Sequence, residues 1–299
     1  MHKFLRAIGF SDITKKDLEM ILDDVITRPE IMKITKDSEG NEFAELSGSF
    51  AANAGITVRG TYQEDDSFHM DYYYPYVFGT SITTNEQIDV EKHAEKESYA
   101  GVCDEVNLGV TLIFYIQNVA DYLAETNRHL SKIHYGAMLA GLSTEGKILC
   151  PVVERKKNDV PAIQKNDRHN QLIAQAREGD EDAIESLTLE DMDTYALLSQ
   201  RVMKEDIFSI VKSTFMPFGI ESDQYTVLGE IIDCVTMENK LTHEKLYGMK
   251  LLCNNIQFDV CINEKDLLGE PAIGRRFRGN VWMPVSYTHL RAHETAANL

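Results

Sequence analysis

Three arginines near the C-terminal end of the chain have the residue types and spacing that most directly suggest ligand chemistry. The stretch GRRFRG carries Arg275, Arg276 and Arg278 beside a phenylalanine, and Trp282 follows closely. Side chains alternate between the two faces of a β-strand, so Arg276, Arg278 and Trp282 are expected to share one face. Guanidinium groups beside an aromatic ring suit single-stranded nucleic acid or a phosphate-bearing ligand. These four residues are therefore candidate ligand-binding residues.

The charge of the whole chain favours a simpler interpretation of these arginines. Acidic residues number 48 against 30 basic ones, which gives a net charge of -18 at pH 7. Such a charge opposes non-specific binding to nucleic acid or to an anionic membrane surface. The arginines then pair with surrounding carboxylates, as exposed ion pairs that contribute little stability. Both interpretations stay open, with nucleic acid the disfavoured partner.

A glycine-rich stretch resembles a phosphate-binding loop but lacks its context. GLSTEGKI matches the pattern G-x-x-x-x-G-K at Gly141, Gly146 and Lys147, with Ile148 where magnesium binding needs Ser or Thr. Such a loop must also open a helix whose N-terminus faces the phosphates. A strand-like stretch, ILCPVV, follows here instead. We therefore expect STEG to be the turn of a hairpin and not part of a nucleotide site.

The acidic run from Glu178 to Asp193 is a candidate surface for a protein partner. It holds eight carboxylates and no lysine or arginine. The run departs from the pattern of calcium-binding loops, so a solvated helix surface or a docking face for a basic partner is expected. Neither a Ser-His-Asp order nor a nucleophile elbow is found. The sequence therefore assigns no catalytic, cofactor-binding or metal-ligating residue and leans away from an enzyme.

The composition is ordinary for a globular protein, with 43% hydrophobic and 26% charged residues. No apolar run reaches the ~18 residues of a membrane span, and the first residues do not form a signal peptide. An odd number of cysteines without a C-x-x-C pair favours reduced thiols in the cytoplasm. They are Cys103, Cys150, Cys234, Cys253 and Cys261.

The elements that must position these residues follow from periodicity. Residues 17–28 have helical spacing, and short runs rich in β-branched and aromatic residues then indicate a mostly antiparallel sheet. Over residues 222–283 the order strand, strand, strand, helix, strand suggests a small barrel of the OB type. The predicted fold class is α+β. The predicted segments are an α+β sheet domain (1–155), a linker with acidic helices (156–221), an OB-like β-barrel (222–284) and a tail (285–299).

The tail does not fit the chain before it. VSYTHLRAHET, from Val285 to Thr295, corresponds residue by residue to one reading frame of a transposase-based sequencing adapter. His289 and His293, one helical turn apart, are therefore not evidence for a metal site. We expect residues 285–299 to be a non-native tail that is disordered or forms an unpacked helix. The true sequence after about residue 283 is then unknown.

Several long phrases of the chain carry a resemblance to a known family. They are LRAIGF, SYAGVCDEVNLGVTLIFYIQN, GDEDAIESLTLEDMDTY, FMPFGIESDQY and VCINEKDLLGEPAIGRRFRGNVW. Together they resemble an uncharacterised family of cytosolic proteins from Gram-positive anaerobes, a domain of unknown function about as long as this chain of 299 residues. The resemblance covers residues 1–283. It implies a cytosolic location and supplies no catalytic residues.

Three hypotheses for the function remain. The leading one is a non-catalytic protein-interaction module that uses the acidic helices or a sheet face. The first alternative is binding of nucleic acid or a nucleotide through the C-terminal barrel. The second alternative is an enzyme without a recognisable motif, which would need a deep pocket with converging polar groups and shifted pKa values.

Overall fold

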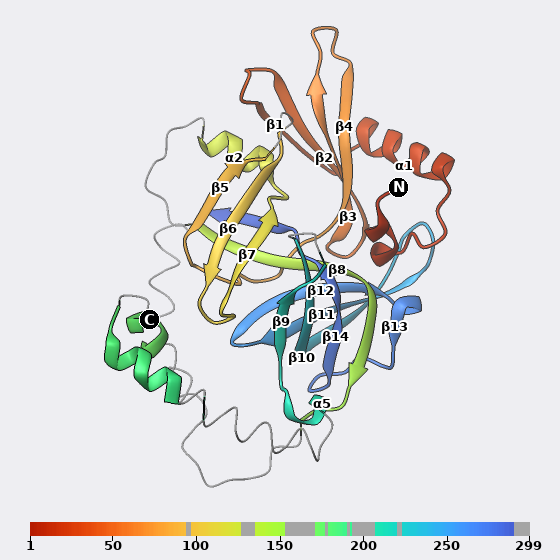
Figure 1. Cartoon of the computed structure of the whole chain (residues 1–299). Helices are drawn as coiled ribbons and strands as arrows, with labels where there is room; N and C mark the ends of the chain where they lie inside the picture. Colours follow the sequence, from red (N-terminus) through yellow and green to blue (C-terminus); the bar gives the residue numbers. More distant parts are fainter. Residues whose placement is uncertain are drawn as a thin grey trace.

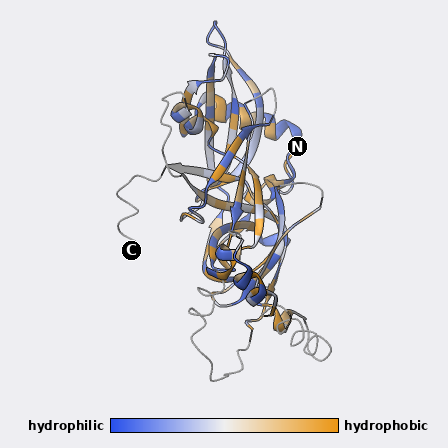
Figure 2. Cartoon of the chain, turned by 60° about the vertical axis from the view of Figure 1, so that its left-hand side comes forward, coloured by the Kyte–Doolittle hydropathy of each residue, from blue (hydrophilic) through white to orange (hydrophobic). Residues whose placement is uncertain are grey.

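Strands make up most of the structure, and they form three sheets with few helices (Figure 1). The computed structural model describes residues 1–93, 97–126, 135–152, 171–176, 179–189, 192, 207–219 and 223–289. The mixed α+β class is therefore confirmed. Hydrophobic and hydrophilic positions alternate along many of the strands, as expected for sheets with one buried face (Figure 2).

The first sheet is an antiparallel meander in the order β1-β2-β3-β4. Two helical elements pack on it, and the second begins with a capping box in which Thr14 and Asp17 satisfy each other's backbone amides. The elements are η1 (Lys3–Ile8), α1 (Lys15–Thr27), β1 (Ile31–Lys36), β2 (Glu42–Ala51), β3 (Ala54–Tyr62) and β4 (Phe68–Val77).

The second sheet is small and antiparallel, and its last strand leads into a helix that contacts β1 and β2. Lys33 of β1 and Asp121 of this helix form an ion pair of 2.6 Å. The elements are β5 (Ile88–Lys92), β6 (Tyr99–Glu105), β7 (Val110–Tyr115) and α2 (Val119–Thr126).

The third sheet combines β8 with the C-terminal strands in the order β11-β12-β8-β14-β10-β9, and β10 also pairs with β11. All of its pairs are antiparallel except β12–β8 and β13–β8. The OB-like barrel stays a prediction at this point. The elements are β8 (Tyr135–Leu149), α5 (Ile207–Ile210), β9 (Thr214–Pro217), β10 (Gln224–Glu238), β11 (Lys245–Cys253), β12 (Ile256–Asn263), η2 (Glu264–Asp266), β13 (Leu267–Leu268), β14 (Arg276–Trp282) and β15 (Val285–His289).

The hairpin expected at STEG is wrong, because β8 is one continuous strand that crosses the middle of the molecule (Figure 1). The glycines of the phosphate-loop pattern serve packing. A Cβ on Gly141 would lie 2.1 Å from Val281 Cγ1, and one on Gly146 would lie 2.4 Å from Phe277 Cε2. Both positions therefore admit only hydrogen, which explains the pattern without a phosphate.

Two hydrophobic clusters hold the sheets together, and each contains residues from more than one of the predicted segments. One cluster joins α1, η1 and the first sheet to Leu246, Cys261 and Trp282 of the third. The other joins the second sheet and α2 to the interior of the third sheet. The predicted boundary at residue 155 separates β8 from the strands β12 and β14 with which it pairs.

The expectation of a disordered or helical tail is wrong for its first five residues. Val285–His289 forms β15, which pairs antiparallel with the first residues of β8. Val285 is 1% exposed, and its carbonyl accepts a hydrogen bond from the amide of Gln117. The alternating β-branched and aromatic residues of VSYTH suit a strand, and β8 offers an edge to pair with. Residues 290–299 lie outside the described residues.

The linker and part of the acidic helices also fall outside the described residues, which leave out 153–170, 177–178, 190–191 and 193–206. Residues 171–176 are helical, and Gly179, which follows after two residues outside the described ranges, has a φ of 89°. Asp180 then caps residues 181–189 by accepting from the amide of Ala183. No helix of the described ranges is long and apolar enough to cross a membrane.

Candidate functional site

Arg276 of β14 is a buried residue that fixes the segment around α5. Its side chain donates hydrogen bonds to three backbone carbonyl oxygens, those of Cys150 at 2.9 Å, Val211 at 2.7 Å and Phe208 at 2.6 Å. Burial lowers the pKa of Arg276 below its ordinary value. An arginine can satisfy carbonyls at a helix C-terminus that have no partner within the helix. Arg276 therefore acts as an anchor that places Phe208.

Arg278, two residues further along β14, lies in the same neighbourhood and faces a second cation. Arg278 and Lys147 are directly opposite each other in the ladder between β14 and β8. The Cζ of Arg278 and the Nζ of Lys147 each lie 5.2 Å from the centroid of the Phe208 ring. Two cations thus contact one aromatic ring, which offsets part of their mutual repulsion.

The repulsion between the opposed Arg278 and Lys147 destabilises the sheet, and the described structure compensates for it only in part. Like charges directly opposite each other in a sheet are destabilising. Within the described part of the chain, neither Arg278 nor Lys147 has a carboxylate within ion-pair distance. This is unexpected in a chain with a net charge of -18. An anionic ligand between the two cations would relieve the repulsion.

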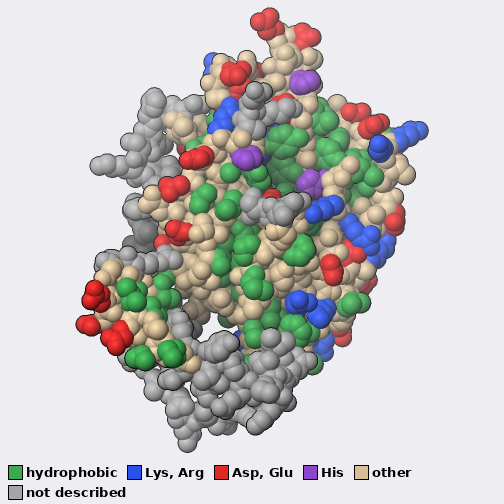
Figure 3. All heavy atoms as spheres, viewed as in Figure 1, with side chains coloured by type: hydrophobic (Ala, Val, Ile, Leu, Met, Phe, Trp, Pro, Cys, Tyr) green, Lys and Arg blue, Asp and Glu red, His purple; other side chains and the backbone are tan. Residues whose placement is uncertain are grey.

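A groove of about 420 Å³ lies over this pair. Two polar side chains on its wall, those of Thr226 and Asn280, hydrogen-bond each other at 2.8 Å. Phe218 and Leu268 are exposed at its margin, and Glu145 contributes one carboxylate. Basic and hydrophobic side chains lie close together over the lower part of the molecule in Figure 3. The groove combines cations, an aromatic ring and neutral polar groups.

The structure brings only part of the predicted site together. Arg278 lines the groove, whereas Arg276 is buried and bonded to backbone carbonyls, and Arg275 donates to the carbonyl of Glu270 at 2.6 Å. Trp282 is 9% exposed, stacks on Phe4 with ring centroids 5.2 Å apart, and donates to a carboxylate oxygen of Asp223. Trp282 therefore belongs to the contact between β14 and the N-terminal element η1.

Lys147 in the groove and Phe208, which contacts Lys147, were not predicted as ligand-binding residues. Lys147 was considered only within the phosphate-loop pattern, and Phe208 was not singled out. A signal for Lys147 existed, since it is a lysine in a strand-like stretch of a strongly acidic chain. Phe208 carried no such signal, because its position depends on hydrogen bonds from Arg276.

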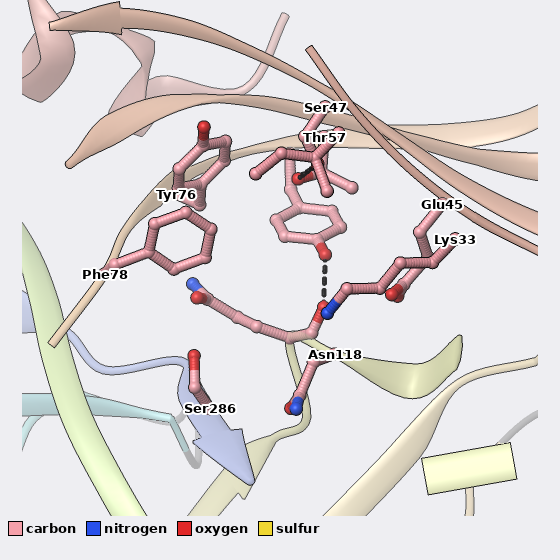
Figure 4. A pocket seen from close by; sticks show the side chains of 11 residues that line it. Lys33, Glu45, Ser47, Thr57, Tyr76, Phe78, Asn118 and Ser286 are labelled. Carbon is pink, nitrogen blue, oxygen red and sulfur yellow. Dashed lines mark hydrogen bonds between the residues drawn. The ribbon is translucent and has the colours of Figure 1, made fainter. Parts of the chain in front are cut away.

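A smaller cavity of about 60 Å³ lies between the first sheet and β15 (Figure 4). Tyr76, Phe78 and Ser286 lie on one side of it, and Lys33 and Glu45 on the other. Such a volume accepts a few water molecules and no larger ligand. We therefore assign it no ligand-binding role.

The described residues give little indication of reactive cysteines or of a metal site. All five cysteines are free thiols, and burial raises the pKa of Cys103, Cys253 and Cys261 to about 12. Such thiols stay protonated and unreactive at neutral pH. No group of three or more His, Cys, Asp or Glu side chains in the described ranges is placed to hold a metal ion.

Comparison with known proteins identifies the family and no function. No curated protein and no solved structure matches the chain. Residues 5–284 match the family described as "Domain of unknown function, E. rectale Gene description (DUF3881)", which is nearly the span of the resemblance noted in the sequence. The match ends immediately before the adapter-like stretch that begins at Val285. The chain therefore belongs to this domain-of-unknown-function family.

Proposed function

We propose that this protein is a cytoplasmic, non-catalytic binding protein for a nucleotide, held in the groove between β8 and β14. The observation that carries the proposal is the directly opposed pair of Lys147 and Arg278, which shares the ring of Phe208. A phosphate group placed between the two side chains would accept hydrogen bonds from both. Arginine is well suited to this because its planar donors match phosphate oxygens.

The other features of the groove favour a ligand with a flat ring beside its phosphate. Its volume of about 420 Å³ lies within the ~300–1,000 Å³ typical of small-molecule sites. Phe218 offers an aromatic surface for a base, and Asn280 and Thr226 offer hydrogen-bonding groups. The net charge of -18 would repel a long polyanion. A nucleotide therefore fits better than a nucleic acid.

We further infer that the third sheet is an OB-like barrel with a changed strand order. Five strands pair in a ring from β10 through β11, β12, β8 and β14 back to β10. This ring has the pairing pattern of an OB barrel when β10 is counted first and β8 last. The β10 pairing passes from β14 to β11 at Glu230, and a bulge between Ile231 and Asp233 follows directly in the β11 pairing. OB barrels commonly bind oligonucleotides and oligosaccharides, which agrees with the proposed ligand.

Charge reversal at either cation is expected to remove nucleotide binding. A hydrogen bond to a charged group contributes ~1.5–3 kcal/mol, so Lys147→Glu or Arg278→Glu should weaken binding by about 10–150-fold. Calorimetric titration with ATP, ADP and AMP measures this. Phe218→Ala should weaken nucleotide binding and leave the affinity for inorganic phosphate unchanged. Binding should also weaken as the salt concentration rises.

Lys16→Glu is the matched control, because it makes the same charge change at an exposed position of α1. This variant should bind like the wild type. The proposal is wrong if no nucleotide binds the wild-type protein, or if Lys16→Glu weakens binding as much as Lys147→Glu does.

The acidic helix supports a second candidate function, the holding of a basic protein partner. In the described part of this segment, Ile184, Leu189 and Met192 are between 46% and 66% exposed, next to several carboxylates. Exposed apolar side chains within a charged surface are typical of protein-interaction sites. Affinity co-purification with and without nuclease should yield a basic protein that survives nuclease and is lost from an Ile184→Lys variant. Recovery of the same partner by that variant would contradict this candidate.

A further inference from the structure

A cavity of about 220 Å³ lies at the meeting point of the three sheets, away from the groove. Its walls come from β4, the end of β7, the end of β14 and the residues before η1. Aromatic rings dominate the lining, and pockets at the junction of structural units are common ligand sites. The rings belong to His2, Tyr72, Tyr73, Tyr74, Tyr115 and Trp282.

Among the described residues of the wall, Arg59 carries the one guanidinium, and this group is already neutralised. Arg59 is 3% exposed, and its Nε donates to the Glu45 carboxylate at 2.6 Å. Its terminal nitrogens donate to the hydroxyls of Tyr72 and Tyr74 and to two backbone carbonyls. An anionic ligand therefore finds no uncompensated cation here. A cationic ligand finds the rings of Tyr72 and Tyr74 already in contact with Arg59.

The cavity nevertheless presents polar atoms that a neutral ligand can use. Ser98 contributes a hydroxyl, and Tyr72 accepts from Arg59 and so retains its own hydrogen to donate. The Nδ1 of His2 is buried and has no hydrogen-bond partner among the described residues. Burial lowers the pKa of His2 to about 4, with Lys3 and the N-terminal ammonium contributing, so the ring is neutral at physiological pH. A buried polar atom without a partner is costly, and a small turn of the His2 ring toward a ligand would satisfy it.

We propose that this aromatic pocket binds an uncharged, flat aromatic compound of one or two rings through stacking and through hydrogen bonds at its edge. The size of the cavity suits one or two rings, and the neutralised Arg59 offers no free charge to an ionic ligand. The inference is independent of the nucleotide proposal, since the groove and the pocket share no lining residue.

The protein carries its own probe for this pocket, because Trp282 is the sole tryptophan of the chain and lines the cavity. Fluorescence of Trp282 is recorded while the full-length protein is titrated with benzamide, benzoate or benzamidinium, three ligands with the same ring and different charge. Adenine is the two-ring probe. Benzamide and adenine should give saturable changes, and the two ions should bind at least about tenfold more weakly, since a desolvated charge is costly.

Variants separate the pocket from other sites. Ser98→Leu fills the cavity and should abolish the saturable change. His2→Phe keeps a ring but removes the nitrogen, and should weaken adenine binding even if Ser98→Leu fails to fold. Lys147→Glu should leave both titrations unchanged, so failure of the nucleotide proposal would not affect this result. The inference is overturned if neither neutral probe gives a saturable change. It is equally overturned if an ion binds as tightly as benzamide, or if a folded Ser98→Leu and His2→Phe bind adenine like the wild type.

Discussion

Replacing Arg59 by methionine is expected to lower the free energy of unfolding by about 3–5 kcal/mol, the range for removing one partner of a buried ion pair. The side chains of Arg59 and Glu45 are 4% and 5% exposed. Without the guanidinium, the buried Glu45 carboxylate loses its facing cation and keeps hydrogen bonds from backbone amides, such as that of Val119 at 3.0 Å. Urea unfolding of the variant and the wild type measures the loss.

The loss should extend beyond the ion pair, because Arg59 also connects two sheets. Its Nη2 donates to the carbonyls of Ile116 at 3.0 Å and Gln117 at 2.5 Å, in the link between β7 and α2. Arg28→Met is the matched control, since Arg28 pairs with Asp24 on the exposed surface of α1. An exposed pair contributes ~0–1 kcal/mol, so this variant should stay close to the wild type. Equal effects of the two substitutions would contradict the buried role of Arg59.

The Arg59→Met penalty should depend on pH in a defined direction. Burial raises the pKa of Glu45, and the facing Arg59 opposes this rise. Removing Arg59 therefore raises the pKa of Glu45 further in the folded state. A carboxyl with a raised folded-state pKa adds stability at low pH, and this contribution is lost as the pH rises through that pKa. The penalty should thus be smaller in mildly acidic urea titrations than at neutral pH.

Gly141→Ala is the second substitution with a large expected effect. The new Cβ would lie 2.1 Å from Val281 Cγ1 and 3.1 Å from the carbonyl oxygen of Trp282. Val281 is fully buried, so it has no free space into which to move. Overpacking of this kind costs ~1–3 kcal/mol, and we expect the upper part of the range. A lowered denaturation midpoint in guanidinium chloride would show it.

Glu145→Ala provides a control in the same strand, at an exposed position where substitutions usually change stability by less than ~0.5 kcal/mol. If Gly141→Ala were as stable as Glu145→Ala, the glycine would not be explained by packing. The phosphate-loop pattern in β8 would then need another account.

Much of the fold was predictable wherever local chemistry and tertiary structure agree. The first strands predicted over residues 222–283 include β11 and β12, and Asn254-Asn255 between them has φ values of 46° and 71°, which suit a tight turn. The helix expected at 17–28 is α1, two residues earlier at its start and one at its end. Phe277 is buried and the neighbouring Arg278 is half-buried, as expected for residues on opposite faces of the predicted strand.

The rest depended on pairings between distant segments. Local turn signals in STEG suggested a hairpin, but β12 and β14 impose an extended strand on these residues. The local sequence likewise gives no indication that Lys147 and Arg278 face each other, since this depends on the register of two strands far apart in sequence. Trp282 lay on the predicted strand, yet its environment is set by Phe4 at the other end of the chain.

The place of β8 in the third sheet has a consequence for how the protein is made. The hydrogen bond from Arg276 to the carbonyl of Cys150 spans 126 positions of the chain. At a synthesis rate of ~5–20 residues per second, roughly 6–25 s pass between the synthesis of β8 and that of β14. During that time the strand edges that will receive β12 and β14 are unpaired and open to other chains. The nascent protein is therefore most prone to aggregate within this interval, and slow passage through residues 150–276 would prolong it.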